Sequence, residues 1–295
     1  MFKEAIINKM SMKAIITMCV SVGVMCSCTN SNDNIAESLY SQASKQYQSG
    51  NYQQSVALLD SLKNNYKDDI DLLKKGLYLR VLNQEGLIKD EIVSNDSLIS
   101  VLESENMELS GSFKYVKLKD MVEGYYIHKS IADKAGDDNR TTIEPRIDET
   151  DMFYLVSYLK GNSVSHTSVA LSSAAGEVSS KSVAYDKSRN YRYNSDGIAY
   201  ESITFTNQEC DTLGYFVANN NSSNVKLTFK GKKQYTVKLE PKMIKAINET
   251  YRFAKNKNQG KSAIKKKMFL EQKLQLAQKQ IEQTNASLQQ KYRKI

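Results

Sequence analysis

Two histidines carry most of the catalytic potential of this chain, and hydroxyl side chains flank one of them. His166 lies between Ser165 and Thr167, within a Ser-rich stretch over residues 163–182. A serine hydroxyl next to an imidazole can perform acyl transfer, provided that a third group orients the ring. The sequence does not show which residue would be that third group, so we interpret the stretch as polar strand faces and loops. We assign no catalytic residue, and we expect His128 on the surface.

The chain offers little for metal or cofactor chemistry. It contains four Cys and two His, and it has no Gly-rich phosphate loop, His-Glu-x-x-His helix or calcium loop. We therefore predict neither a metal site nor a cofactor. Some tyrosines could stack on sugar rings, but strand tyrosines usually pack in a core, and the absence of Trp weakens a sugar-binding hypothesis. These tyrosines are Tyr191, Tyr193, Tyr200 and Tyr215.

The composition is that of a folded chain long enough for two modest domains, since it has 295 residues. Hydrophobic residues make up 40% and charged residues 25%, which excludes both a polytopic membrane protein and wholesale disorder. The elements that position any site must therefore form ordinary globular cores.

The N-terminus has the organisation of a secretory signal. Three lysines precede an apolar run of twelve residues, 14–25, which is too short to span a bilayer core of about 30 Å. A run of that length fits the central region of a signal peptide, which we place at residues 1–27. Translation could start at Met1, Met10 or Met12, because the segment from Met12 is by itself a complete short signal.

The end of this segment, Val24-Met25-Cys26-Ser27-Cys28, resembles the lipobox of bacterial lipoproteins, in which a small residue directly precedes a Cys. Cys28 is the better acceptor, because Ser27 before it is small whereas Met25 before Cys26 is bulky. The resemblance implies that Cys28 carries a diacylglycerol and a fatty acyl chain such as palmitate, with residues 28–34 as tether. The alternative is a buried hydrophobic N-terminal helix with incidental cysteines.

Several consequences follow from the lipoprotein resemblance. Only Cys210 remains in the mature chain, so an internal disulfide and a Cys2His2 zinc site are both impossible. Thr29, rather than Asp, follows the acylated Cys, which implies lipid anchoring at the outer membrane; the periplasmic or surface face stays open. The composition is similar to that of Bacteroidetes envelope lipoproteins. A nucleic-acid partner is not expected outside the cytoplasm.

Residues 35–107 show helical periodicity on both sides of Gly50. The helices resemble one tetratricopeptide repeat, and the positions that match are Leu39, Ala43, Gly50, Tyr52 and Leu59. Ser55 replaces the usual Ala and Lys67 the usual Pro, and the second unit is degenerate. Because a lone repeat cannot bury its own face, the module must pack on the rest of the chain or on a partner. It is either a concave peptide-binding surface or a platform for the next domain.

Residues 108–240 change to a period of two, which predicts an antiparallel β-domain, either a sandwich or an open barrel. The clearest unit is a hairpin of strands 225–229 and 235–239 around Gly231. Further strands are expected at 152–159, 168–171, 198–200, 203–205 and 213–217, with a leading hairpin at 113–116 and 125–127 and a loop at 137–142.

Three Asp-Ser/Thr-Leu triplets resemble the O-glycosylation sequon of Bacteroidetes exported proteins. The acceptors would be Ser61, Ser97 and Thr212. Ser97, which we expect in a loop, is the best of the three. Triplets this short also arise by chance in a chain rich in Asp and Ser.

Residues 241–295 return to a helical pattern, with a polar break expected at 256–260. From Leu270 to Ile295, steps of four and three define the seam of a short coiled coil or docked helix, so oligomerisation through 264–295 is one option. Residues 252–295 hold twelve Lys/Arg and two Glu, a net charge of +10. The charge indicates contact with an anionic envelope polymer or lipid surface, or else a solvated helix. The contact residues would be Lys265, Lys266, Lys267, Lys273 and Lys279.

Together these patterns predict an α+β chain: a short helical module, a mainly antiparallel β-domain and a C-terminal amphipathic helix. The favoured function is a membrane-anchored envelope lipoprotein that acts as a non-enzymatic protein-interaction or scaffold module. The alternatives are an envelope hydrolase or a glycan-binding lipoprotein with its site in the β-domain. A Ser/His/carboxylate cluster in a pocket would favour the hydrolase, and a flat strip of exposed tyrosine rings would favour glycan binding.

Overall fold

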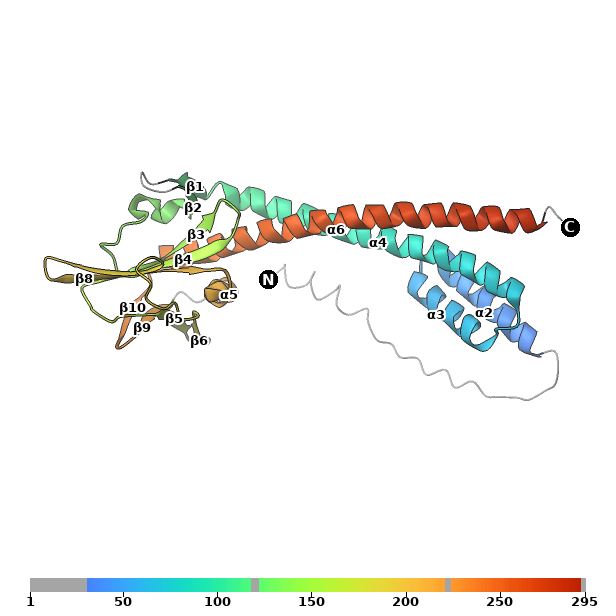
Figure 1. Ribbon diagram of the computed structural model, residues 1–295, viewed down its shortest axis with the longest axis horizontal. Helices are drawn as coiled ribbons and strands as arrows, with labels where there is room; N and C mark the ends of the chain where they lie inside the picture. The colour runs from blue at the N-terminus through green and yellow to red at the C-terminus, as the bar shows by residue number, and fades with distance from the viewer. Residues whose placement is uncertain (1–30, 118–121, 221–223, 293–295) are drawn as a thin grey trace. The chain divides into compact units, whose positions relative to one another are not determined.

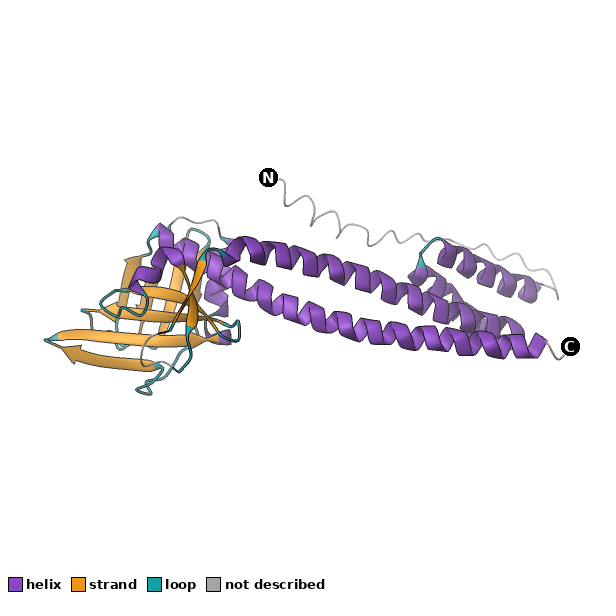
Figure 2. Ribbon diagram, turned by 90° about the horizontal axis from the view of Figure 1, so that it is seen from above, coloured by secondary structure: helices purple, strands orange, loops and turns teal. Residues whose placement is uncertain are grey.

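The computed structural model describes residues 31–117, 122–220 and 224–292. Cys28 and the predicted signal lie outside these ranges. The described residues divide into two compact units, one of residues 31–86 with 281–292 and one within residues 87–280. An N-terminal helical region is followed by antiparallel sheets and a long C-terminal helix, so the predicted α+β class is confirmed (Figures 1 and 2).

The first unit is built on helices α2 (Ser31–Gln48), α3 (Tyr52–Asn65) and the beginning of α4 (Ile70–Ser110). The turn between α2 and α3 falls at Gly50, whose φ of +76° favours glycine. Ala43, Leu59, Leu62 and Leu79 are buried together between the helices. The two helices predicted on either side of Gly50 are therefore present. That they belong to the tetratricopeptide family remains a prediction.

Ser55, which replaces the Ala of the family pattern, forms part of a buried polar link between the three helices. Its hydroxyl donates to the carbonyl oxygen of Ala43 at 2.7 Å and accepts from the Asn83 side-chain amide at 2.8 Å. A buried hydroxyl with both partners costs little, whereas an alanine here would remove one of the two acceptors of the Asn83 amide, which also donates to the Leu79 carbonyl oxygen at 2.8 Å. Ser55, the residue that departs from the family pattern, thus has a hydrogen-bond partner on α4.

The second unit contains two antiparallel sheets. The six-stranded sheet has the order β1-β2-β3-β4-β8-β7, and its strands are β1 Phe113–Val116, β2 Tyr125–His128, β3 Thr142–Asp148, β4 Phe153–Lys160, β8 Ile198–Thr206 and β7 Asn190–Ser195. The four-stranded sheet has the order β10-β9-β5-β6, with β10 Gln234–Lys238, β9 Lys226–Lys230, β5 Ser168–Ser173 and β6 Gly176–Ser179. Both predicted hairpins are present, since β1 pairs with β2 and β9 with β10.

Two local predictions in the β-domain are wrong. The segment 213–217 is not a strand but part of helix α5 (Asp211–Asn219), because a short apolar run is compatible with either period. Gly214 allows the Tyr251 ring to approach the helix more closely than any side chain would permit. Strand β3 was missed because it carries Glu144, Pro145 and Arg146, which are nevertheless buried.

Helix α6 (Pro241–Tyr292) is continuous, so the expected polar break at 256–260 is also wrong. Side-chain amides in that stretch have partners instead of ending the helix. Asn256 donates to the Glu105 carboxylate at 2.9 Å, and Asn258 donates to the carbonyl oxygens of Asp151 and Ala254 at 2.7 and 2.9 Å. These bonds satisfy polar groups that a loop would have exposed to water.

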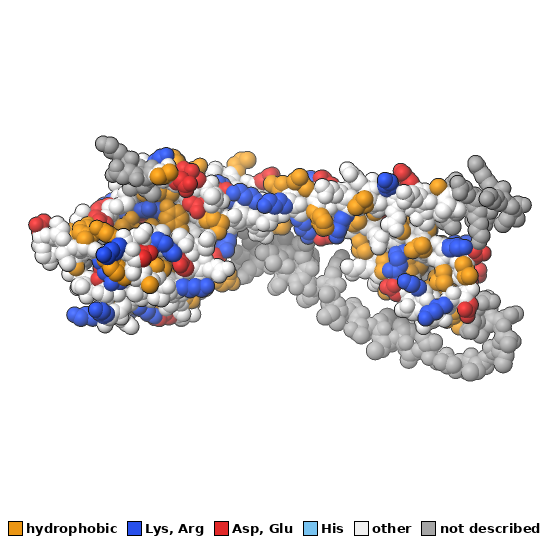
Figure 3. Space-filling model, in the orientation of Figure 1, with side chains coloured by type: hydrophobic (Ala, Val, Ile, Leu, Met, Phe, Trp, Pro, Cys, Tyr) orange, Lys and Arg blue, Asp and Glu red, His pale blue; other side chains and the backbone are white. Residues whose placement is uncertain are grey.

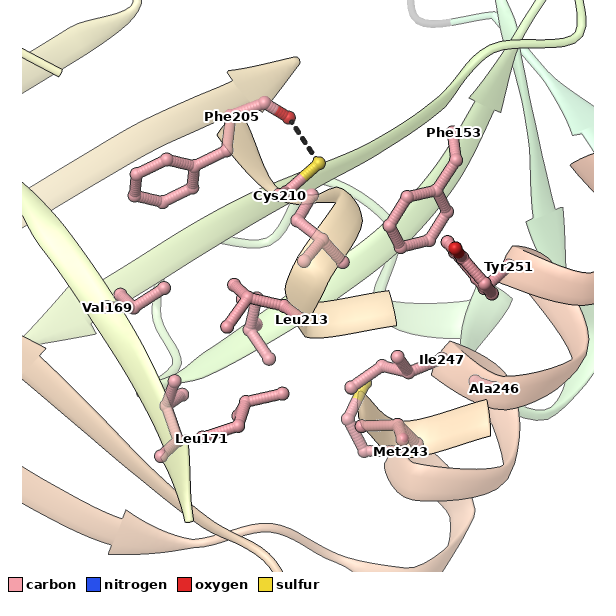
Figure 4. Close-up of a cluster of buried hydrophobic side chains, with 14 of the residues drawn as sticks. Phe153, Val169, Leu171, Phe205, Cys210, Leu213, Met243, Ala246, Ile247 and Tyr251 are labelled. Atoms are coloured by element: carbon pink, nitrogen blue, oxygen red, sulfur yellow. Dashed lines mark hydrogen bonds between the residues drawn. The ribbon is translucent and has the colours of Figure 1, made fainter. Parts of the chain in front are cut away.

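The core of the second unit lies where the two sheets, α5 and the start of α6 meet. Phe153 and Phe205 of the larger sheet face Leu171 of the smaller sheet, Leu213 of α5 and Ile247 of α6 (Figure 4). Cys210 is buried here, and desolvation by burial raises the pKa of its thiol to about 12. A thiol that stays protonated in a core is a poor nucleophile.

Among the helices of the described residues, none is long and apolar enough to cross a membrane.

Candidate functional site

Within the second unit, residues 87–110 of α4 and the first forty residues of α6 run antiparallel; we name them the helical pair. The Asn95 side-chain amide donates to the Ala263 carbonyl oxygen at 2.8 Å. On α6, Ala263, Leu270 and Ala277 are buried. On α4, Asn95 and Leu102 are buried, and the partly buried Ile88, Ile92 and Ile99 fall with them at steps of three and four. Two matched seams are typical of an antiparallel coiled coil, so α4 is the element on which the predicted seam docks.

Charge is divided unevenly between the two helices of the helical pair. Residues 87–110 contain six carboxylates and one lysine, and residues 241–280 contain eleven Lys/Arg and two Glu. Ion pairs connect Lys266 to Glu91 at 2.8 Å and Lys267 to Asp96 at 2.9 Å. The hydrogen bond to Asp96 also raises the pKa of Lys267.

These ion pairs modify the predicted anionic-surface contact. Lys266 and Lys267 are directed toward α4, and Lys273 lies over the Phe269 ring, 4.6 Å from its centroid. Lys265 and Lys279 are exposed. The basic stripe is therefore narrower than the sequence suggested, and its contact with an anionic surface stays a prediction.

Large apolar side chains are exposed along the helical pair. Met268 is 58% and Phe269 55% exposed on α6, and Val101 is 56% exposed on α4. Others are Val93, Leu98, Met107, Ile264 and Leu276. Figure 3 shows apolar side chains grouped over this stretch of the helices. Grouped exposed apolar residues with a polar surround mark surfaces that contact other molecules.

All three proposed O-glycosylation acceptors lie on helices. Ser97 is in the middle of α4, so the expected loop is wrong; its hydroxyl donates to the Val93 carbonyl oxygen at 2.9 Å. Ser61 on α3 bonds to the Ala57 carbonyl oxygen at 3.2 Å, and Thr212 on α5 bonds to the Ser179 carbonyl oxygen at 3.3 Å. Glycosylation at these positions remains a prediction.

His166 has the third group that the sequence did not show. Its Nε2 lies 2.9 Å from the Ser157 hydroxyl, and its Nδ1 lies 2.6 Å from the Glu201 carboxylate. Ser157 and His166 are completely buried and Glu201 is 5% exposed. The three residues have the connectivity of a catalytic triad, but no substrate reaches a hydroxyl without exposed surface.

The hydrogen bonds of Glu201 indicate a structural role for this buried cluster. Its carboxylate accepts the backbone N–H groups of Val164, Ser165 and His166 at 2.7–2.8 Å. Burial by itself would raise the pKa of Glu201, but the hydrogen bonds from the His166 ring and backbone lower it to about 2. The carboxylate thus clamps the connection between β4 and β5, one of the segments that join the two sheets.

A second buried network surrounds Arg146 on β3. Its guanidinium donates to Glu144 at 2.7 Å and to the Tyr158 hydroxyl at 2.8 Å, and it lies 3.9 Å from the centroid of the Tyr125 ring. Burial would lower the pKa of Arg146, but Glu144 and the tyrosines raise it above its ordinary value. Arg140 donates to the second Glu144 oxygen at 2.5 Å, which secures the loop before β3. The charged groups of the network are paired with one another, while the buried Tyr125 hydroxyl has no hydrogen-bond partner among the residues that the structure describes.

The candidate sugar-stacking tyrosines do not form an open platform. Tyr193 and Tyr200 stack on each other, with ring centroids 4.7 Å apart and planes inclined by 3°. The Tyr193 hydroxyl donates to Asp138 at 2.6 Å. Tyr191 and Tyr215 are exposed, but Tyr215 is on α5 rather than on a sheet. Ring faces that cover each other are not available to a sugar.

His128, which we expected on the surface, is only 4% exposed. It is the last residue of β2, and its ring meets the edge of the Phe113 ring at 5.5 Å. The expectation is wrong because the His128 ring packs against Phe113 and contacts the Glu249 carboxylate, while Lys129 is exposed.

The sequence matches no protein-family model, and comparison with curated proteins and with solved structures gives no match.

Proposed function

We propose that this chain is a lipid-anchored lipoprotein of the outer envelope that binds a protein partner through the helical pair. The observation that supports this proposal is the group of exposed apolar side chains along α4 and α6, with Met268 and Phe269 among the most exposed. Leaving such side chains in water forgoes about 25 cal/mol for each Å² of apolar surface that a partner could cover.

The charge of the helical pair also restricts which kind of partner can bind. The α6 side of the helical pair is strongly basic, and lysines such as Lys265 lie beside the exposed apolar residues. A partner with an apolar centre and an acidic rim would complement this surface and bind in one orientation. The proposed function is thus recognition of a protein partner by the helical pair, which the β-domain supports.

Introducing a charge into the apolar surface should weaken partner binding. A photo-reactive residue at Ile264 should give discrete cross-linked adducts in intact cells. Met268→Glu should lower their yield at least about tenfold, because the carboxylate must be desolvated in the interface. Gln259→Glu adds the same charge at an exposed position of the same helix and should leave the yield unchanged. Absence of adducts from both Ile264 and a second probe at Val101 would contradict the proposal.

The anchor is tested by Cys28→Ala. This variant should lose palmitate labelling and leave the membrane fraction, because acylation is the proposed apolar attachment of the mature chain. Continued labelling would identify Cys26 as the acceptor. Retention of an unlabelled protein in the membrane fraction would instead indicate an uncleaved hydrophobic helix.

A further inference from the structure

A second serine–histidine–carboxylate set lies in the β-containing unit and, unlike the first, has an exposed serine. His128 ends β2, Ser130 follows in the short 3-10 helix η1 (Lys129–Lys134), and Glu249 is on α6. The Ser130 hydroxyl lies 2.7 Å from His128 Nδ1, and His128 Nε2 lies 2.8 Å from a Glu249 carboxylate oxygen. Nucleophile, base and orienting group are therefore all within hydrogen-bond distance.

The backbone decides which imidazole nitrogen is basic. The Ser130 backbone N–H can only donate, and it donates to His128 Nδ1 at 3.2 Å. Nδ1 must therefore accept, and in the neutral ring Nε2 carries the proton and donates it to Glu249. The lone pair of the ring consequently faces the Ser130 hydroxyl, which is the arrangement that a general base requires.

The His128 ring is held from several sides. Phe113 contacts its face at near-perpendicular geometry, Glu249 binds Nε2, and Lys245 lies 3.7 Å from the other oxygen of Glu249. A base with one orientation needs no rearrangement before it accepts a proton. This differs from a surface histidine, whose ring would rotate freely.

Ser130 also lines a cavity of about 370 Å³, which is the feature that the buried Ser157 lacks. Four cationic side chains surround the cavity, and they are Lys134, Arg140, Lys238 and Lys242. Two carboxylates, Asp133 and Glu240, also line it, and Lys242 pairs with Glu240 at 2.8 Å. The Thr142 hydroxyl adds a polar contact. Because Arg140 is paired with Glu144 and Lys242 with Glu240, Lys134 and Lys238 face one remaining carboxylate, Asp133, and the lining has a small excess of positive charge next to an accessible hydroxyl.

We propose that Ser130 is the nucleophile of an ester-hydrolysing activity toward small carboxylic esters that also carry a negative charge. Ser130 Oγ attacks the ester carbonyl carbon while its proton passes to His128 Nδ1. The C–O bond to the leaving group then breaks, and the leaving oxygen takes that proton, so an alcohol departs and an acyl-Ser130 remains. His128 then takes a proton from water, whose oxygen attacks the acyl carbon. The bond to Ser130 Oγ breaks, and Oγ takes the proton from His128, which releases the carboxylic acid and restores Ser130.

Glu249 is a positioning residue in this scheme, because it touches only His128 and stabilises the ring when the ring is protonated. The cations of the cavity set the substrate class. The side-chain ammonium groups of Lys134 and Lys238 make no hydrogen bond or ion pair with any residue that the structure describes, so an anionic group on the substrate would give them a partner. Acylated acidic sugars, free or at the end of an envelope glycan, have this chemistry.

The test treats the purified full chain in detergent with a fluorophosphonate probe and locates the adduct by mass spectrometry. We expect modification at Ser130. Ser130→Ala should abolish it and lower the hydrolysis of 4-acetoxybenzoate at least about 100-fold. This variant keeps the Ser130 backbone N–H that donates to His128 Nδ1, so it should fold normally. Ser163→Ala, which removes an exposed hydroxyl elsewhere, should behave as the wild type.

Three further outcomes decide the proposal. Glu249→Gln should slow labelling at least about tenfold without changing the melting temperature, whereas unchanged labelling would show that Glu249 only supports the fold. Faster hydrolysis of the neutral 4-acetoxybenzamide than of 4-acetoxybenzoate would overturn the anionic substrate class. No adduct at Ser130, under conditions that fully label a known serine hydrolase, would overturn the activity. Partner binding through the helical pair is tested separately and does not depend on these results.

Discussion

Glu201→Ala should destabilise the β-containing unit by about 5 kcal/mol or more, since it removes the acceptor of four donors, three of them buried and one partly buried. Three are backbone N–H groups of Val164, Ser165 and His166, and the fourth is the His166 ring. Each buried donor left without a partner costs about 1–3 kcal/mol, and a domain has only about 5–15 kcal/mol in total. Urea unfolding followed by circular dichroism measures the loss.

Glu177→Ala is the matched control for this substitution. Its carboxylate pairs with Lys230 at 2.6 Å, but the side chain is half exposed, so the pair contributes less than about 1 kcal/mol. If the two variants lose similar stability, Glu201 does not clamp the connection between β4 and β5.

The same carboxylate makes stability depend on pH. The pKa of Glu201 in the folded chain is about 2, below the ordinary value of about 4.3 for an unfolded chain. A lowered folded pKa contributes stability that is present above pH 4.3 and is lost as the pH falls toward 2, by about 3 kcal/mol. We expect the wild type to lose stability more steeply than Glu201→Gln over that range, and parallel curves would contradict the assignment.

Leu59→Asp should unfold the first unit. Leu59 is 3% exposed and packs with Ala43, Leu62 and Leu79 between the helices. A carboxylate there has no cationic partner among these side chains, and burying an unpaired charge costs several kcal/mol. Hydrogen exchange of the backbone amides of residues 31–86 should accelerate by at least about 100-fold, because 2.7 kcal/mol corresponds to about that factor.

Ala57→Asp provides the comparison, since Ala57 is an exposed position of the same helix, two residues away. Ala57→Asp introduces the same charge and should change the hydrogen-exchange rates of the backbone amides little. Equal protection in Leu59→Asp and in the wild type would remove the interpretation of this region as a packed helical module.

Local patterns of residues were sufficient for the elements whose periodicity is unambiguous. The turn at Gly50, the hairpin of β9 and β10, and the buried seam at Leu270 and Ala277 are all where the sequence places them. Each depends on contacts between near neighbours in sequence or on one face that must avoid water, and such requirements are written in the spacing of apolar residues.

Elements with a mixed pattern were decided by their surroundings. The run from Leu213 to Val217 became a helix because Gly214 fits against Tyr251, and the polar stretch of α6 stayed helical because Asn256 finds Glu105 on α4. Strand β3 is buried despite Glu144 and Arg146 because these two side chains pair with each other. Tyr251 and Glu105 lie far from Gly214 and Asn256 in the sequence, whereas Glu144 is only two residues from Arg146 on the same strand.

The two serine–histidine–carboxylate sets show most clearly which features follow from local pattern and which from tertiary packing. The sequence by itself determined that His166 lies among hydroxyls and that His128 precedes Ser130 by two residues. Only the tertiary structure brought Glu201 to His166 over 35 residues and Glu249 to His128 over 121 residues. It also decided which serine is accessible, sealing Ser157 and leaving Ser130 at a cavity. The physical reason is that burial and hydrogen-bond partners depend on how sheets and helices pack, which a one-dimensional pattern of residue types does not contain.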